Sequence, residues 1–98
     1  MSEYQITRWH DIPSMVVARQ DAIVVKILLA NRFQESIDEA AMRMGEIDAD
    51  AYTSGWIRDP WQSSEESPQL LAEKIARELE EKFTQDYLQT VLDSLGTR

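Results

Sequence analysis

Apolar and polar residues alternate strictly between residues 4 and 9. This period of two is typical of a half-buried β-strand, in which successive side chains point to opposite faces. Residues 10–14 contain Asp11 and Pro13 and predict a turn, because proline has no amide donor and favours extended geometry in the residue before it. Residues 15–19 follow as a second short strand. The two strands together predict a β-hairpin.

The next apolar run, residues 21–30, shows no clear period. Its apolar residues would cover every side of a regular element, so periodicity does not distinguish a buried strand from a buried helix. The β-branched residues in its first half favour a strand over residues 23–27, with a helix as the alternative.

Residues 31–45 have the pattern of an amphipathic helix. Asn31 belongs to the residue types that cap helix N-termini, and Gly45 stands where a helix commonly ends in left-handed geometry. Apolar residues at spacings of three and four form one stripe, which we expect to pack against the sheet. The stripe consists of Phe33, Ile37, Ala40, Ala41 and Met44.

The region of residues 46–67 is polar and is interrupted by Gly55 and Pro60. Residues 50–54 predict a short helical turn. Residues 56–62 predict a last strand, which Pro60 would confine to a sheet edge or break.

The C-terminal third predicts helices. Ser67 is a capping residue, and Pro68 suits the first helical position, where its missing amide costs nothing. The apolar stripe of this helix is Leu70, Leu71, Ile75, Leu79 and Phe83. Thr84 is a cap for a second helix over residues 85–95, and one continuous helix is the alternative. The second helix has the stripe Tyr87, Leu88, Val91, Leu92 and Leu95.

These elements predict an α+β fold with a small, mainly antiparallel sheet of about three strands and two or three helices packed on one face. A chain of 98 residues has the length of one domain. We expect residues 1–83 to form a single α+β domain and residues 84–98 to form a C-terminal amphipathic helical extension.

The net charge of −8, from 18 acidic and 10 basic residues, changes the picture of possible partners. The basic residues are scattered singly, so the sequence lacks the positive face that nucleic acids and anionic membranes require. A protein partner or a second copy of the chain is the expected contact. Because the sequence contains neither a basic and apolar leader nor an apolar run of about 20 residues, we also expect a cytoplasmic location.

The candidate chemistry is sparse. Without cysteine, the chain has no disulfide, no thiolate nucleophile and no cysteine metal site. His10 is the single histidine, and Asp11 beside it would point the opposite way on an extended chain, so we expect a turn histidine with its ring in solvent. An acidic loop, Glu46, Asp48 and Asp50, lacks the glycine and the final carboxylate of a calcium loop. The sequence therefore predicts no catalytic residue, no cofactor and no metal.

Aromatic residues outside the helices are the strongest candidates for contacts with a partner. Tryptophan and tyrosine beside arginine make effective interface anchors, because a large apolar body carries a polar tip. The alternative is that the aromatic rings fill the core. The candidate partner-binding residues are Tyr52, Trp56, Arg58 and Trp61, with Leu88 and Leu92 of the last helix as a second surface.

Several short strings give the sequence a familiar fingerprint over roughly residues 4–82. They are Tyr4-Gln5, Trp9-His10-Asp11-Ile12-Pro13-Ser14, Ala18-Arg19, Arg32-Phe33-Gln34, Ile37-Asp38, Ala40-Ala41-Met42, Ala51-Tyr52 and Trp56, followed by the acidic helix after Ser67. In these strings the chain resembles a family of small bacterial proteins named virulence factor. A basic residue is usual in that family at the position of His10, which counts against an essential imidazole.

The resemblance suggests an accessory role beside an enzyme, and it brings no established catalytic residues to this chain. Members of the family tend to be encoded near enzymes of folate- and corrinoid-linked one-carbon metabolism. The first hypothesis is accordingly a non-enzymatic accessory or protein-interaction domain, a small subunit or partner of such an enzyme. The alternative is a small enzyme or ligand-binding protein whose pocket is lined by Trp9, Tyr52, Trp56 and Arg58.

Overall fold

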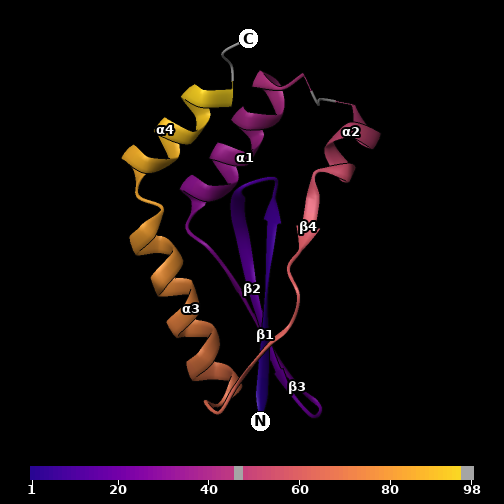
Figure 1. The fold of residues 1–98 in the computed structure, drawn as a ribbon, viewed down its shortest axis with the longest axis vertical. Coiled ribbons are helices and arrows are strands. Elements are labelled where there is room, and N and C mark those ends of the chain that lie inside the picture. Colours follow the sequence, from indigo (N-terminus) through magenta and orange to yellow (C-terminus); the bar gives the residue numbers. More distant parts are fainter. Residues whose placement is uncertain (46–47, 96–98) are drawn as a thin grey trace.

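The computed structural model describes residues 1–45 and 48–95, which form an α+β fold of five strands and four helices (Figure 1). In chain order the elements are β1 (Ser2–Trp9), β2 (Ile12–Gln20), β3 (Ile23–Leu28), α1 (Asn31–Arg43), α2 (Ala49–Ser54), β4 (Trp56–Arg58), β5 (Gln62–Ser64), α3 (Pro68–Lys82) and α4 (Gln85–Leu95).

All strand pairs of the sheet are antiparallel, in the order β3-β2-β1-β4, with β5 also paired to β1. β2 runs along one side of β1, and β4 and β5 share its other side. The sheet therefore has five strands, where the sequence predicts about three. One additional strand arises around Pro60, because the segment expected as a single strand ends at Arg58 and resumes at Gln62 as β5, which pairs with another part of β1.

Two tight turns connect the first three strands. His10 and Asp21 adopt left-handed backbone geometry in these turns, with φ angles of 51° and 54°. The first turn is shorter than the sequence predicts, since β2 already begins at Ile12. Pro13 fits within β2 because the pairing with β1 is irregular between Thr7 and Arg8.

The ambiguous apolar run is a strand. β3 pairs with β2 from Met15 to Gln20 and lies at the edge of the sheet. Ile23, Val24 and Leu28 are between 55% and 74% exposed, so their apolar character does not reflect burial. This explains why hydrophobic periodicity could not assign the segment.

Helix boundaries follow the sequence pattern with two corrections. α1 is followed by Gly45 at φ 73°, as expected, but Asn31 lies inside the helix and the N-cap position belongs to Ala30. Ser67 occupies the N-cap position of α3 but makes no capping hydrogen bond through its side chain. α3 and α4 are separate helices, since the chain leaves helical geometry at Phe83 and the Thr84 hydroxyl accepts a hydrogen bond from the Tyr87 amide (3.2 Å).

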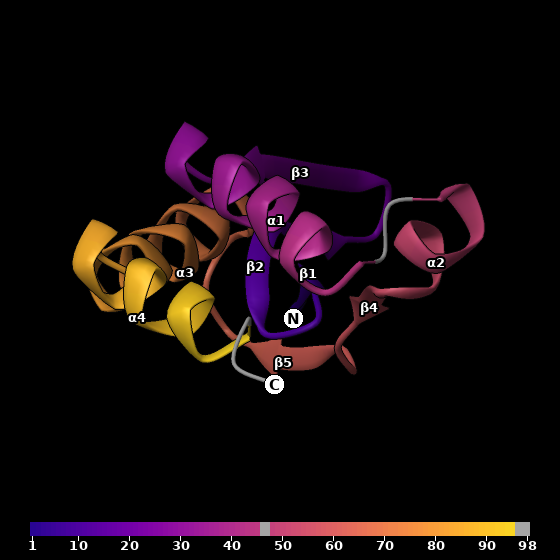
Figure 2. The same ribbon diagram turned by 90° about the horizontal axis from the view of Figure 1, so that it is seen from above.

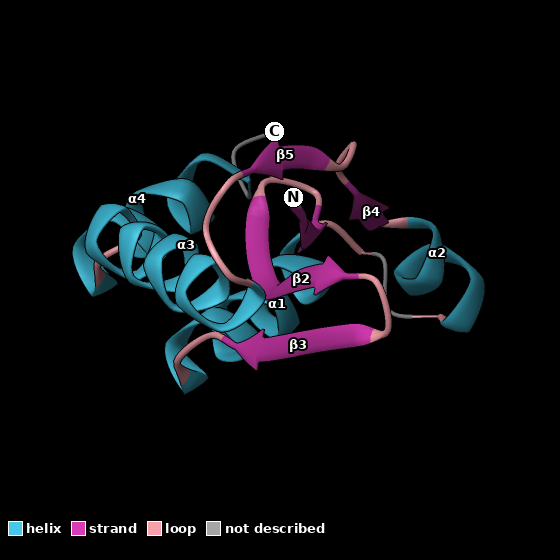
Figure 3. Ribbon diagram, turned by 90° about the horizontal axis from the view of Figure 1, so that it is seen from below, coloured by secondary structure: helices cyan, strands magenta, loops and turns pink. Residues whose placement is uncertain are grey.

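The buried core lies between the sheet and three helices. α3 contacts β1, β2 and β3, while α1 contacts β2 and α4. Figures 2 and 3 show α3 and α4 together on one side of the sheet and α2 apart from them, beside β4. Leu70, expected in the buried stripe of α3, is 60% exposed, whereas Leu71 of the same stripe is 2% exposed and belongs to the core.

Candidate functional site

The strand register divides the sheet into two faces. One face, which we call the covered face, consists of residues that belong to the core or pack against it: Tyr4, Ile6, Val16, Ala18, Val25 and Ile27. The opposite face, the open face, carries Gln5, Thr7, Met15, Val17, Lys26 and Leu28. None of the open-face residues belongs to the described core.

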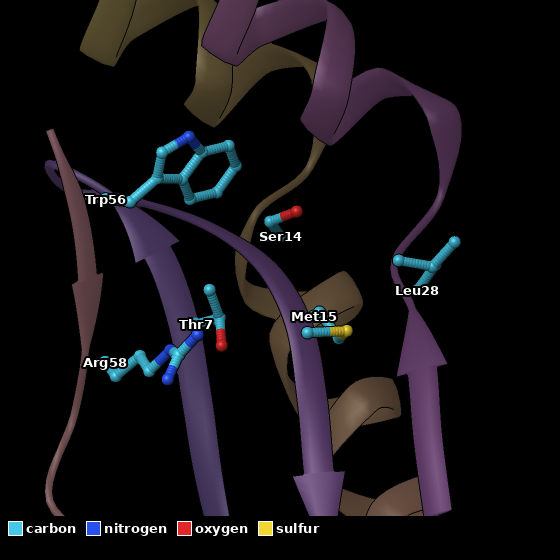
Figure 4. Close-up of a pocket in the computed structure, with 6 residues that line it drawn as sticks. All are labelled: Thr7, Ser14, Met15, Leu28, Trp56 and Arg58. Atoms are coloured by element: carbon cyan, nitrogen blue, oxygen red, sulfur yellow. The ribbon is translucent and has the colours of Figure 1, made fainter. Parts of the chain in front are cut away.

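A cavity of about 620 Å³ lies on the open face (Figure 4). Trp56 and Arg58 of β4 stand on one side of it and Leu28 of β3 stands on the other, with Thr7, Ser14 and Met15 between them. A second hollow of about 190 Å³ is lined by Gln5, Thr7, Met15, Val17, Lys26 and Arg58. Since the two hollows share three residues, we treat them as one feature, the open-face groove.

Trp56 is held at the wall of the groove by a short aromatic cluster. The Trp9 indole is fully buried, stacks on the Tyr52 ring at 5.7 Å and donates from Nε1 to the Tyr52 carbonyl oxygen (2.7 Å). The Tyr52 ring in turn meets Trp56 edge to face at 6.0 Å. α2 therefore closes one end of the open face over Trp9 and fixes the position of Trp56.

Gly55 makes this arrangement possible. A Cβ atom at this position would lie 2.4 Å from Trp9 Nε1 and 2.5 Å from Trp9 Cε2. No carbon approaches those atoms so closely without displacing them. The Gly55 carbonyl also accepts a hydrogen bond from the His10 amide (2.9 Å), which ties the end of α2 to the turn after β1.

Arg58 is positioned by the residue that follows it. Asp59 accepts a hydrogen bond from Arg8 Nε (2.8 Å), and its amide donates to the Ile6 carbonyl oxygen (3.0 Å). The Gln5 side-chain amide donates to the Asp59 carbonyl oxygen (3.0 Å). These contacts fix β4 on β1, and Arg58 directly opposite Thr7 then extends over the open face.

The residues predicted as contact residues fall into three places. Trp56 and Arg58 line the groove, and Tyr52 supports Trp56. Trp61 lies near the other end of β1, half-buried, with the Arg19 guanidinium 3.7 Å above its ring. Arg19 also pairs with Glu3 (3.1 Å).

Leu88 and Leu92 lie away from the groove and inside the protein. Leu88 is fully buried and Leu92 is 6% exposed, both within the same core cluster as Phe33 of α1. α4 packs on α1, and Arg43 Nη1 donates to the Leu92 carbonyl oxygen (2.9 Å). Leu88 and Leu92 are therefore covered by the chain itself, whereas Tyr87 of the same stripe is 43% exposed.

Sequence reasoning missed much of the groove: Thr7, Met15, Lys26 and Leu28 were not among the candidates. The alternation in β1 already places Gln5 and Thr7 on the face opposite to Tyr4 and Ile6, so the contribution of β1 to the groove could have been predicted. The contribution of β2 and β3 depends on how these two strands pair, which no local sequence pattern reveals.

The remaining candidates for chemistry stay isolated. The His10 ring is half-buried and meets the Trp9 ring edge-on at 4.3 Å, so the expected solvent-exposed ring is not seen. Within residues 1–45 and 48–95, no group of three or more metal-ligating side chains could hold a metal ion. Glu46, part of the acidic loop singled out above, lies outside the described residues.

The geometry defines a class: a small α+β domain with an antiparallel sheet, helices over one part of it and a groove on an open face. The chain belongs to the virulence factor family, whose sequence model matches residues 7–92. A search among curated proteins and a search among solved structures each gave no match. No helix in the described part of the chain combines the length and apolar content needed to cross a bilayer.

Proposed function

We propose that this chain is a non-enzymatic interaction domain that binds a partner protein through the open-face groove. The observation that supports this function is a half-buried tryptophan, Trp56, which packs against the core and lines the groove beside an exposed arginine, Arg58. Tryptophan and arginine are the residue types that contribute most to binding energy at protein interfaces. The polypeptide around them is fixed, which limits the entropy lost on binding.

The groove is lined by side chains that are suited to contact with a partner. Within the described chain its lining consists of hydroxyl, thioether, aliphatic, amide, indole and cationic groups, with no carboxylate or imidazole among them. General acid–base catalysis uses histidine most often and carboxylates frequently, although lysine can also serve. This chemistry favours binding over catalysis as the role of the groove.

The first partner to test is an enzyme of folate- or corrinoid-linked one-carbon metabolism, because the resemblance described above implies such a neighbour. A cytoplasmic location, expected from the sequence, would place the two proteins together. The geometry of the groove supports a protein contact, and the identity of the partner rests on the resemblance alone.

Isothermal titration calorimetry with purified candidate enzymes from the same host tests this function. We expect binding by the wild type, a loss of at least about tenfold in affinity for Trp56→Ala and Arg58→Glu, and no change for Arg77→Glu. Arg77 is a matched control, since it is an exposed arginine of α3, outside the groove. Binding that Trp56→Ala and Arg58→Glu both leave unchanged would exclude the groove as the contact surface.

A small-molecule ligand is the second candidate, because a cavity of about 620 Å³ is within the size range of ligand sites. A thermal-shift screen of cellular metabolites, repeated with Trp56→Ala, separates the two functions. A compound that stabilises the wild type but not Trp56→Ala would favour the ligand-binding alternative.

A further inference from the structure

We propose that the part of the partner that enters the open-face groove is an acidic, extended peptide segment. Its carboxylate meets Arg58 and Lys26, and an apolar side chain two residues away packs between Trp56 and Leu28. This inference rests on the proposed function and adds the chemical nature of the ligand.

The two cations of the groove have no acidic partner in the part of the chain that the structure describes. Arg8 pairs with Asp59, and Arg19 pairs with Glu3. Arg58 and Lys26, in contrast, make no ion pair or side-chain hydrogen bond among the described residues, and both are exposed. A carboxylate brought between them would gain charge-assisted hydrogen bonds, and the arginine can bind it in a bidentate manner.

Charge is segregated between the sheet and the helices. The five strands contain four basic residues and one acidic residue, whereas the four helices contain ten acidic and five basic residues. The strands are thus net basic, and the acidic excess behind the net charge of −8 comes from the helices and the segments between the elements. At physiological ionic strength, exposed charges farther away than about 8 Å are largely screened, so an acidic peptide in the groove responds mainly to Arg58 and Lys26.

The spacing of the groove matches that of an extended peptide. Lys26 lies in the register row of Gln5 and Val17, and Leu28 lies two positions further along β3, in the row of Thr7 and Met15. Residues two apart on a strand are separated by about 6.6 Å and point to the same side. Arg58 shares the row of Thr7, Met15 and Leu28, and Trp56 lies two positions away from Arg58 on β4, in the direction opposite to the Lys26 row. The cationic pair Lys26 and Arg58 and the apolar pair Leu28 and Trp56 are therefore offset by one such step. A peptide that runs along the strands presents residues i and i+2 to the two pairs.

Selection of random peptides displayed on phage against the immobilised protein tests this inference. The best peptides are then synthesised with a fluorescent label, and their affinities are measured by fluorescence anisotropy. We expect enriched peptides to carry an acidic and a large apolar residue two positions apart. Affinity should fall at least about tenfold for Arg58→Glu and for Trp56→Ala, and it should be unchanged for the matched control Arg77→Glu.

A charge exchange provides the second arm of the experiment. Replacing the acidic residue of the selected peptide by lysine should abolish binding to the wild type and restore it to the double variant Lys26→Glu/Arg58→Glu. Circular dichroism on each variant shows whether it is folded, so that a lost interaction is not confused with a lost fold.

The outcomes separate the two proposals. Neutral or basic peptides that depend on Trp56 but not on Arg58 would overturn the acidic ligand while leaving the groove as a protein-binding site. Peptides insensitive to both Trp56→Ala and Arg58→Glu, or the absence of any enriched peptide, would overturn the acidic peptide ligand. The calorimetric test with the purified enzymes then decides separately whether the groove binds a partner protein. Competition of the selected peptide by free glutamate at equal concentration would point instead to a small organic anion and contradict the peptide assignment.

Discussion

The covered face and the open face are built from the same strands, because successive residues along a strand point to opposite faces of the sheet. On β2, Val16 and Ala18 are fully buried on the covered face, while their neighbour Val17 lines the groove on the open face. Burial of apolar surface stabilises the fold through the first set of positions. The positions of the open face are half-buried or exposed, and polar and cationic groups stand among them. The difference teaches that stability and recognition occupy alternate positions in one stretch of sequence.

The largest loss of stability is expected from a substitution in the core that packs on the covered face. Phe33 of α1 is 1% exposed and its ring lies 6.0 Å from that of Phe83. Phe33→Ala should lower the free energy of unfolding by about 3–5 kcal/mol, because the substitution removes buried surface and leaves a cavity. Urea denaturation measures the change, with the exposed Leu70→Ala as control. A loss below about 1 kcal/mol for Phe33→Ala would contradict the assignment of this core.

The second largest loss of stability is expected from a substitution at Gly55, where α2 closes one end of the open face. Gly55→Ala places a methyl group within 2.5 Å of the Trp9 indole, so the indole or α2 must move. We expect a loss of up to about 3 kcal/mol in unfolding free energy. The emission of the Trp9 indole should also shift toward that of a solvated ring, a readout best made in a Trp56→Phe/Trp61→Phe background. A variant as stable as the wild type would show that Trp9 and Gly55 are not in contact.

Two neighbouring valines test the comparison of the faces most directly. Val16→Ala removes the same atoms as Val17→Ala, but Val16 is fully buried and Val17 is only half-buried. The first substitution should cost about 2 kcal/mol in unfolding free energy and the second less than about 1 kcal/mol. Equal losses, measured by urea denaturation of both variants, would mean that the open face is covered in solution.

Much of the fold could be predicted from the sequence because its patterns are local. Each of these patterns spans only a few residues: the alternation in β1, the three- and four-residue spacing in α1 and the proline at the start of α3. The Thr84 cap shows the same point, since it separates α3 from α4 through a hydrogen bond to a residue three positions later.

The sheet edges and the groove could not be predicted in the same way. β3 carries apolar residues on both faces, with Lys26 as its one charged residue, so its sequence does not indicate which side is buried. The separation of β4 from β5 at Pro60 depends on how each segment pairs with β1, far away in the sequence. The groove joins Thr7, Lys26 and Arg58 across three strands, and residues so distant in the chain leave no common local pattern.

The smallest effect on stability is expected in the groove itself. Arg58→Gln and Lys26→Gln alter exposed side chains that make no ion pair among the described residues, so each should change the free energy of unfolding by less than about 0.5 kcal/mol. Removal of two like charges from one face also relieves repulsion, which favours a slight gain over a loss. The double variant should therefore unfold at the same urea concentration as the wild type, or slightly above it. A loss larger than about 1 kcal/mol would show that the two cations stabilise the sheet, and they would then no longer be available to an acidic ligand.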